Sequence, residues 1–134
     1  MAKILIVDDD PSLRAMICIL LHTSGHETLI ARDGQEALEL VKQNALDLMI
    51  TDLRMPHMDG MNLLRAVKAL ALSMPVILIT AYSSRETAAE AVKLGAFAYV
   101  AKPFEIKALM DTVGRALDAG KAKTRATGLT GGSE

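Results

Sequence analysis

Short apolar runs alternate along this chain with longer segments in which apolar residues recur at helical spacing. The runs are brief and bounded by Gly, Pro or acidic residues, so we expect them to be strands buried on both faces, as in a parallel sheet. Single helices connect successive strands, which predicts an α/β fold with a doubly wound, five-stranded parallel sheet and five helices. The expected strands lie at about residues 3–7, 26–31, 47–51, 76–79 and 97–101.

Capping residues predict where the helices begin and end. Asp10 is expected to cap the first helix, with Pro11 at its first position, where the missing N–H of proline costs nothing. Gly25 is expected to end that helix. The other helices are expected after the turn Asp33-Gly34, after Asp59-Gly60, from near Ser84 to Gly95, and from after Pro103 to about Ala119.

Residues 120–134 differ from the rest of the chain. They contain one large apolar residue, Leu129, among Gly, Lys and Thr residues, so they cannot bury a core. We therefore expect a folded domain over residues 1–119 and a flexible C-terminal tail or linker over residues 120–134. Such a segment could join the domain to a second one.

Composition limits the classes of protein that fit. The chain has 134 residues, 51% hydrophobic and 3% aromatic, which indicates one domain with an aliphatic core. The net charge of -1 gives no basic field for direct nucleic-acid binding. No apolar run approaches the roughly 18 residues of a membrane span, and the first strand starts too near Met1 for a signal peptide. We expect a cytoplasmic protein without a membrane partner.

Functional polar residues stand where four of the expected strands end. Asp8 and Asp9 follow the first strand, Asp52 the third, Thr80 the fourth and Lys102 the fifth. Parallel strands all end at one edge, and open α/β sheets place their sites outside the carboxyl ends of strands, at a topological switch point. We therefore expect these side chains to converge in one pocket.

Three of these residues are carboxylates that would lie close together. Asp8, Asp9 and Asp52 would repel one another, and a cation or protons would relieve that repulsion. Hard oxygen ligands suit Mg²⁺, which usually takes one or two protein carboxylates together with water and phosphate oxygens. The sequence thus predicts Mg²⁺ as the cofactor.

Five separated motifs carry a resemblance to a known family. The chain resembles the receiver (CheY-like) domain of two-component response regulators over residues 3–119, and its stretch from Thr80 to Ala96 looks most like receivers of nitrogen-regulatory-type activators. The resemblance implies a flavodoxin-like sheet of order 2-1-3-4-5. The motifs are Val7-Asp8-Asp9-Asp10, the stretch from Asp52 to Gly60, Thr80-Ala81, Gly95-Ala96 and Lys102-Pro103-Phe104.

The resemblance also implies the chemistry. Asp52 is the phosphoacceptor, and it receives the phosphoryl group from a sensor histidine kinase or a small phosphodonor. Asp9 and Asp52 bind the metal directly, Asp8 acts through water, and the backbone carbonyl of Arg54 completes the protein ligands. Lys102 neutralises the charge of the phosphoryl group, and its peptide bond to Pro103 is cis. Such bonds are uncommon, at about 5% of X-Pro bonds. The protein would be a signalling switch whose only catalysis is its own aspartyl phosphorylation and dephosphorylation.

Two further positions are implied as the switch. The Thr80 hydroxyl would bond a phosphoryl oxygen, and Tyr99 would then swing from exposed to buried. The face formed by the fourth helix, the fifth strand and the fifth helix would signal to an effector domain or protein, or to a second copy in a phosphorylation-linked homodimer. His22, His26 and His57 lack metal spacing and are expected to have surface or capping roles.

Two alternatives remain open at this point. An Asp-x-Asp after a first strand also occurs in Mg²⁺-dependent haloacid-dehalogenase-type phosphatases, which would make Asp8 the nucleophile, although that motif normally continues with Gly-Thr and this chain has Pro11-Ser12. The other alternative is a receiver-like module that binds partners without phosphorylation; the intact acids, Thr80 and Lys102 speak against it.

Overall fold

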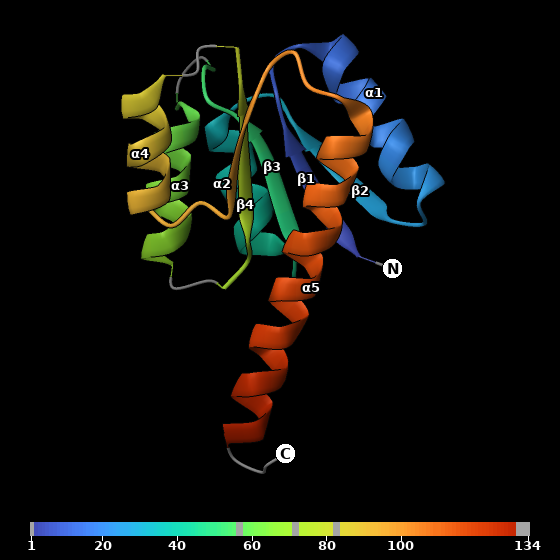
Figure 1. Cartoon of the computed structure of the whole chain (residues 1–134), viewed down its shortest axis with the longest axis vertical. Helices are drawn as coiled ribbons and strands as arrows, with labels where there is room; N and C mark the ends of the chain where they lie inside the picture. The colour runs from blue at the N-terminus through green and yellow to red at the C-terminus, as the bar shows by residue number, and fades with distance from the viewer. Residues whose placement is uncertain (1, 56–57, 71–72, 82–83, 131–134) are drawn as a thin grey trace.

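The computed structural model of the protein describes residues 2–55, 58–70, 73–81 and 84–130. Within them, five strands alternate with five helices (Figure 1). The strands are β1 (Lys3–Val7), β2 (Glu27–Ala31), β3 (Leu48–Asp52), β4 (Val76–Thr80) and β5 (Ala98–Ala101). The helices are α1 (Pro11–Thr23), α2 (Gly34–Gln43), α3 (Gly60–Ala69), α4 (Arg85–Lys93) and α5 (Ile106–Thr130).

The strands form one parallel sheet in the order β2-β1-β3-β4-β5, so the expected fold is confirmed. Every residue of β3 and β4 is buried, because helices cover both faces of the sheet (Figure 1). This burial explains why the strands are continuous apolar runs rather than alternating ones. β1 lies between β2 and β3, and the chain reverses its direction of winding there, which creates the switch point beside the ends of β1 and β3.

Alternate strand residues build two aliphatic cores, one on each face. Leu5 and Val7 of β1 pack with residues of α2, α3 and α4. Ile4 and Ile6 pack on the other face with residues of α1 and α5. Figure 1 shows the same division, with α2, α3 and α4 on one side of the sheet and α1 and α5 on the other. The sheet that carries the strand ends is thus held from both sides.

Acidic and hydroxyl side chains begin four of the helices. Asp10 caps α1 by accepting from the amide of Ser12 at 3.0 Å, as predicted, and Pro11 is the first helical residue. Asp33, Asp59 and Ser84 cap α2, α3 and α4 in the same way. Gly34 and Gly60 are already helical, so the caps place these glycines in the first turn rather than in a preceding loop.

The last helix is longer than the sequence predicted. α5 continues to Thr130, and Figure 1 shows its C-terminal part projecting beyond the sheet. The prediction of a helix end near Ala119 is therefore wrong, because the helix includes residues 120–130; a tail or linker role for residues 120–134 stays a prediction. Adding residues to an existing helix needs no new nucleus, and the Ala, Lys and Arg residues of this segment have high helix propensity, which favours continuation of the helix. Within the described residues, no helix has the length and apolar character needed to cross a bilayer.

Candidate functional site

The ends of β1 and β3 bring three carboxylates together. Asp8 directly follows β1, and Asp52 is the last residue of β3. One carboxylate oxygen from each of Asp8, Asp9 and Asp52 lies within 4.8 Å of the others. Asp8 and Asp52 are buried, at 3% and 8% relative exposure, and Asp9 is exposed. The cluster therefore has a buried floor and one acid on the side open to solvent.

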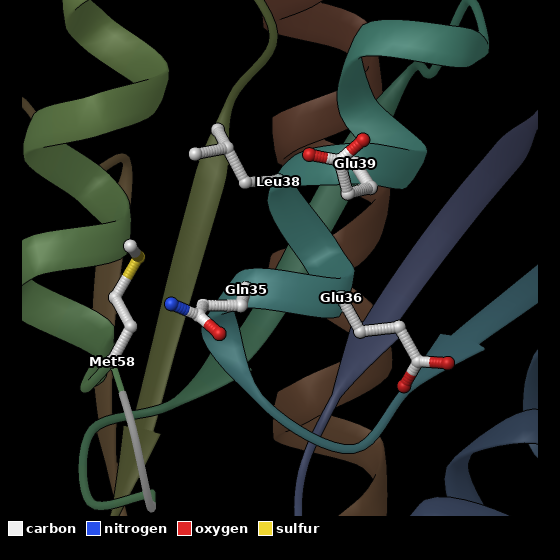
Figure 2. A pocket seen from close by; sticks show the side chains of 5 residues that line it. All are labelled: Gln35, Glu36, Leu38, Glu39 and Met58. Atoms are coloured by element: carbon white, nitrogen blue, oxygen red, sulfur yellow. The ribbon is translucent and has the colours of Figure 1, made fainter.

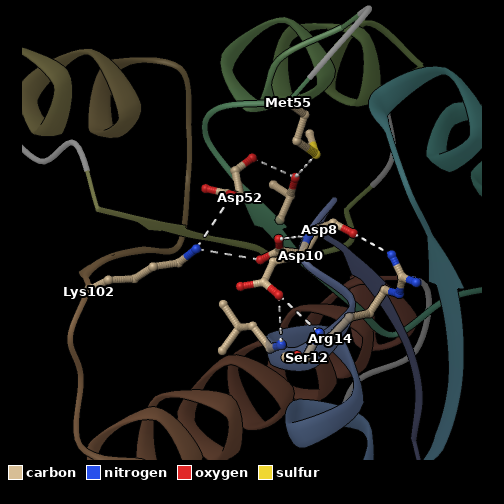
Figure 3. Close-up of polar contacts among 9 residues, drawn as sticks. Asp8, Asp10, Ser12, Arg14, Asp52, Met55 and Lys102 are labelled. Atoms are coloured by element: carbon tan, nitrogen blue, oxygen red, sulfur yellow. Dashed lines mark hydrogen bonds and ion pairs between the residues drawn. The ribbon is translucent and has the colours of Figure 1, made fainter.

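Lys102 lies against this cluster from the end of β5. Its Nζ is 3.6 Å from Oδ2 of Asp8 and 3.5 Å from Oδ2 of Asp52, as Figure 3 shows. The Lys102–Pro103 peptide is cis, and the Lys102 amide donates to the Thr80 carbonyl at 2.8 Å. Thr80, at the end of β4, is fully buried. The structure thus places all four strand ends at one edge.

Burial and neighbouring negative charges disfavour the ionised form of the Asp8 carboxyl. Burial is the largest cause that raises the pKa of the Asp8 carboxyl above its usual 3.8, and the charges of Asp52 and Asp9 raise it further. A hydrogen bond from the Asp10 amide, 2.8 Å long, and the Lys102 ammonium lower it, but the net direction is upward. A further cation at this site would lower the electrostatic cost of ionising Asp8.

The donor set fits Mg²⁺. All three clustered groups offer hard oxygen ligands, and the exposed position of Asp9 leaves room for the waters that Mg²⁺ retains. Asp9 and Asp52 would hold the ion, with Asp8 behind them. Arg54 has an exposed side chain, and its backbone carbonyl as a further ligand stays a prediction.

Two glycines hold the loop that follows Asp52. A Cβ on Gly60 would collide with the Asp52 carbonyl oxygen, and the Gly60 amide donates to the Leu53 carbonyl at 2.8 Å. A Cβ on Gly34 would lie 2.6 Å from the Met58 carbonyl oxygen. Only glycine permits these approaches. The sequence analysis placed both glycines just before helices and missed their close contacts with the loop that follows Asp52.

Tyr99 differs from its prediction. Its ring is half-buried rather than exposed, because it packs against the core on the side of α2, α3 and α4. Its hydroxyl is buried and has no hydrogen-bond partner among the described residues. The expected outward starting position is therefore not what this structure shows.

The remaining sequence candidates lie apart from the carboxylates. His22 lies 3.1 Å from the Thr28 hydroxyl, and the His26 ring accepts from the Ala2 amide at 3.2 Å, which fits structural roles. His57, like Pro56 and Tyr82, lies outside the described residues.

A separate hollow lies beside α2. Figure 2 shows Met58 across from side chains of α2 at this hollow. Its lining contains neither the clustered acids nor Lys102, and it offers no cation-binding cluster. The lining residues are Gln35, Glu36, Leu38, Glu39 and Met58.

Comparison with known families decides between the possible uses of such an edge. Residues 4–114 match the model described as the response regulator receiver domain. The chain belongs to this family. It is a receiver domain of two-component response regulators, and it acts as a signalling switch rather than as an ordinary enzyme.

Curated relatives are regulatory proteins. The receiver domain is 44% identical over 114 residues to the transcriptional regulatory protein ZraR of Escherichia coli, covering 85% of this chain and 26% of ZraR. It is 44% identical over 115 residues to the regulatory protein AtoC of the same species, covering 86% of this chain and 25% of AtoC. The chain thus spans about a quarter of the length of these relatives.

Solved structures agree on the fold. The CheY-like receiver domain protein of Methanospirillum hungatei superimposes with a TM-score of 0.88 at 30% identity, covering 92% of this chain and 98% of that one. NtrX of Brucella abortus gives a TM-score of 0.88 at 33% identity, covering 96% of this chain and 29% of NtrX. The homologues of this chain thus include response regulators of the nitrogen-regulatory (NtrC) type, as the sequence indicated.

We expect Asp8→Asn to stabilise the metal-free protein at neutral pH by on the order of 1 kcal/mol. A buried carboxyl with a raised pKa destabilises the folded state when ionised, and an amide oxygen can still accept from the Asp10 amide. As the pH falls through the raised pKa of Asp8, the wild-type carboxyl becomes protonated in the folded state, so the advantage of the variant should shrink. Thermal melts in chelator from about pH 8 to about pH 4 measure this.

Asp33→Asn is the matched control, because asparagine caps a helix as well as aspartate does and Asp33 is half-buried rather than buried. It should show no gain that shrinks with pH. A destabilised Asp8→Asn variant at neutral pH, or a gain independent of pH, would contradict the electrostatic description.

Proposed function

We propose that this receiver domain accepts a phosphoryl group on Asp52 in a Mg²⁺-dependent reaction, from a sensor histidine kinase or a small phosphodonor such as acetyl phosphate. The observation that supports this is the position of Asp52. Its carboxylate lies in the cluster with Asp8 and Asp9, and its Oδ2 is 3.5 Å from the Lys102 ammonium. A nucleophile, a cation-binding cluster and a fixed positive charge therefore share one edge.

The chemistry follows from these positions. A carboxylate oxygen of Asp52 attacks phosphorus in line, a P–O bond forms, and the bond from phosphorus to the donor breaks, with its electron pair leaving on the donor. The product is an aspartyl phosphate. Bound Mg²⁺ would supply positive charge to the phosphoryl oxygens, held by Asp9 and Asp52, with Asp8 acting through water and the Arg54 carbonyl as a further ligand.

Lys102 and Thr80 would bind the transferred group. The Lys102 ammonium contacts Asp52 at its Oδ2, so it can move to a phosphoryl oxygen while staying near the same carboxyl group. The Thr80 hydroxyl belongs to a neighbouring strand end and can donate to another phosphoryl oxygen. Water attack on the aspartyl phosphate would later return Asp52 to its free form, which makes the phosphorylation reversible.

The signal would leave through the face formed by α4, β5 and α5. Three large apolar residues are exposed there: Val92 at 70%, Phe97 just before β5 at 38% and Ile106 at 48%. When Thr80 moves toward the phosphoryl group, the packing of Tyr99 on β5 would change, and the phosphorylated arrangement of this face would become the favoured one. An effector domain, a partner protein or a second copy would bind that arrangement.

Asp52→Asn should abolish phosphorylation by acetyl phosphate and Mg²⁺, because the amide is not a competent nucleophile for this transfer. Intact-protein mass spectrometry detects the mass gain of one phosphoryl group in the wild type and should find none in the variant. Asp59→Asn is the control: it lies in the same loop and caps α3, and asparagine keeps the cap, so phosphorylation should persist.

Other outcomes separate the alternatives. Normal phosphorylation of Asp52→Asn would overturn the assignment of the acceptor. A phosphoryl group located on Asp8 by peptide mapping would support phosphatase-type chemistry instead. A wild type that takes up no phosphoryl group from any donor would support a module that signals without phosphorylation.

Phosphorylation should change the amide chemical shifts of Tyr99 and of the α4, β5 and α5 face, in addition to those near Asp52. In Thr80→Ala phosphorylated to the same extent, the changes near Asp52 should persist while those on the face shrink, since the hydroxyl that links the two is gone. Thr80→Ser keeps a hydroxyl and should restore them. Two-dimensional NMR spectra with and without acetyl phosphate measure this. Equal changes on the face in Thr80→Ala and wild type would rule out Thr80 as the link.

A further inference from the structure

We propose that Arg14 is a positioning residue that holds the Asp8–Asp9 peptide group and thereby keeps the Asp9 carboxylate in the metal-binding cluster. This inference rests on the proposed function in one respect, namely that the cluster binds Mg²⁺. It concerns a residue of α1 that the motifs of the sequence did not single out.

The contact that supports the proposal is a hydrogen bond from a side chain to the backbone. Nη1 of Arg14 donates to the carbonyl oxygen of Asp8 at 2.8 Å, as Figure 3 shows. The side chain comes from the beginning of α1 and is half-buried. The register of the sheet pairs Val7 with Ala31 and with Thr51, so the Asp8 carbonyl lies one residue beyond the paired part of β1. The guanidinium binds the chain at the point where the ladder ends.

Holding this carbonyl restrains Asp9. The peptide group is planar, so fixing the Asp8 carbonyl oxygen also fixes the direction in which the chain leaves toward the Cα of Asp9. Asp9 is exposed, and packing therefore does little to restrain it. Its carboxylate nevertheless lies within 4.8 Å of those of Asp8 and Asp52.

Two other contacts complete the support of this loop. The Asp10 amide donates to Oδ1 of Asp8 at 2.8 Å, and Oδ1 of Asp10 accepts from the Ser12 amide at 3.0 Å. Both tie the loop on the side of Asp10, whereas Arg14 acts on the peptide before Asp9. Asp9 is thus restrained on both sides. Groups that support metal ligands commonly orient them in this way.

Mg²⁺ alone is the probe. Isothermal titration of the folded protein with MgCl₂ should give a dissociation constant about tenfold higher for Arg14→Met than for the wild type, as is typical when a group that orients a metal ligand is lost. Arg14→Lys keeps the charge but replaces the planar guanidinium with a compact ammonium, and should lie between the two, about threefold weaker than the wild type. Arg115→Met is the matched control, because Arg115 also donates from a helix to an oxygen, the Thr112 hydroxyl at 3.2 Å, and it should leave Mg²⁺ affinity unchanged.

The melting temperature in chelator separates positioning from stability. A residue with a merely structural role would lower the melting temperature and leave the Mg²⁺ dissociation constant of the folded protein unchanged, and that result would overturn the proposal. If Arg14→Met does not fold, Arg14→Lys decides, and a dissociation constant equal to that of the wild type would overturn the proposal. A wild type that binds no Mg²⁺ would remove the metal-dependent function and this inference together, whereas a binding wild type with an equally binding Arg14→Met would remove only the inference.

Discussion

Repulsion between carboxylates at the switch point is the constraint on which the rest of the site depends. β1 pairs directly with β3, so the ends of these strands bring the side chains of Asp8 and Asp52 together. Both side chains are buried. Lys102 offsets part of this charge by contacting both. Burial, the largest cause, together with the charges of Asp52 and Asp9, still holds the pKa of Asp8 above its usual value despite this contact. Such a site would favour a cation, and under the proposed function a phosphoryl group on Asp52 would then give Lys102 a new partner.

The strand ends that carry the site are more deeply buried than α4, which belongs to the face proposed to signal. Asp52 and Thr80 end strands whose residues are all buried, which fixes their positions. α4 buries only Ala91 among its residues, and its link to α3 includes a 2.6 Å ion pair between half-exposed Arg65 and Glu90. Exposed ion pairs contribute about 1 kcal/mol or less. An element held this weakly can change its packing at low cost, which suits the face proposed to signal.

Local rules made most of the fold predictable, and long-range contacts account for the remainder. The continuous apolar runs that are β3 and β4 follow from burial on both faces, and Asp10 followed by Pro11 is a local capping pattern, so both could be predicted. The positions of Asp8, Asp52 and Lys102 followed from the topology alone. Arg14 was missed because its partner is a backbone carbonyl, which has no signature in the sequence. The length of α5 was missed because residues 120–130 contain one large apolar residue, Leu129, and so have no apolar pattern that would mark the end of the helix.

The dependence of unfolding on Mg²⁺ tests the central claim most directly, because a ligand that binds only the folded state stabilises it by an amount that grows with the logarithm of its concentration relative to the dissociation constant. At about one hundred times its dissociation constant, Mg²⁺ should raise the free energy of unfolding by about 2.7 kcal/mol. Asp52→Asn should lose most of that gain. Stability of the wild type that does not change with Mg²⁺, or an equal gain in both proteins, would contradict the account.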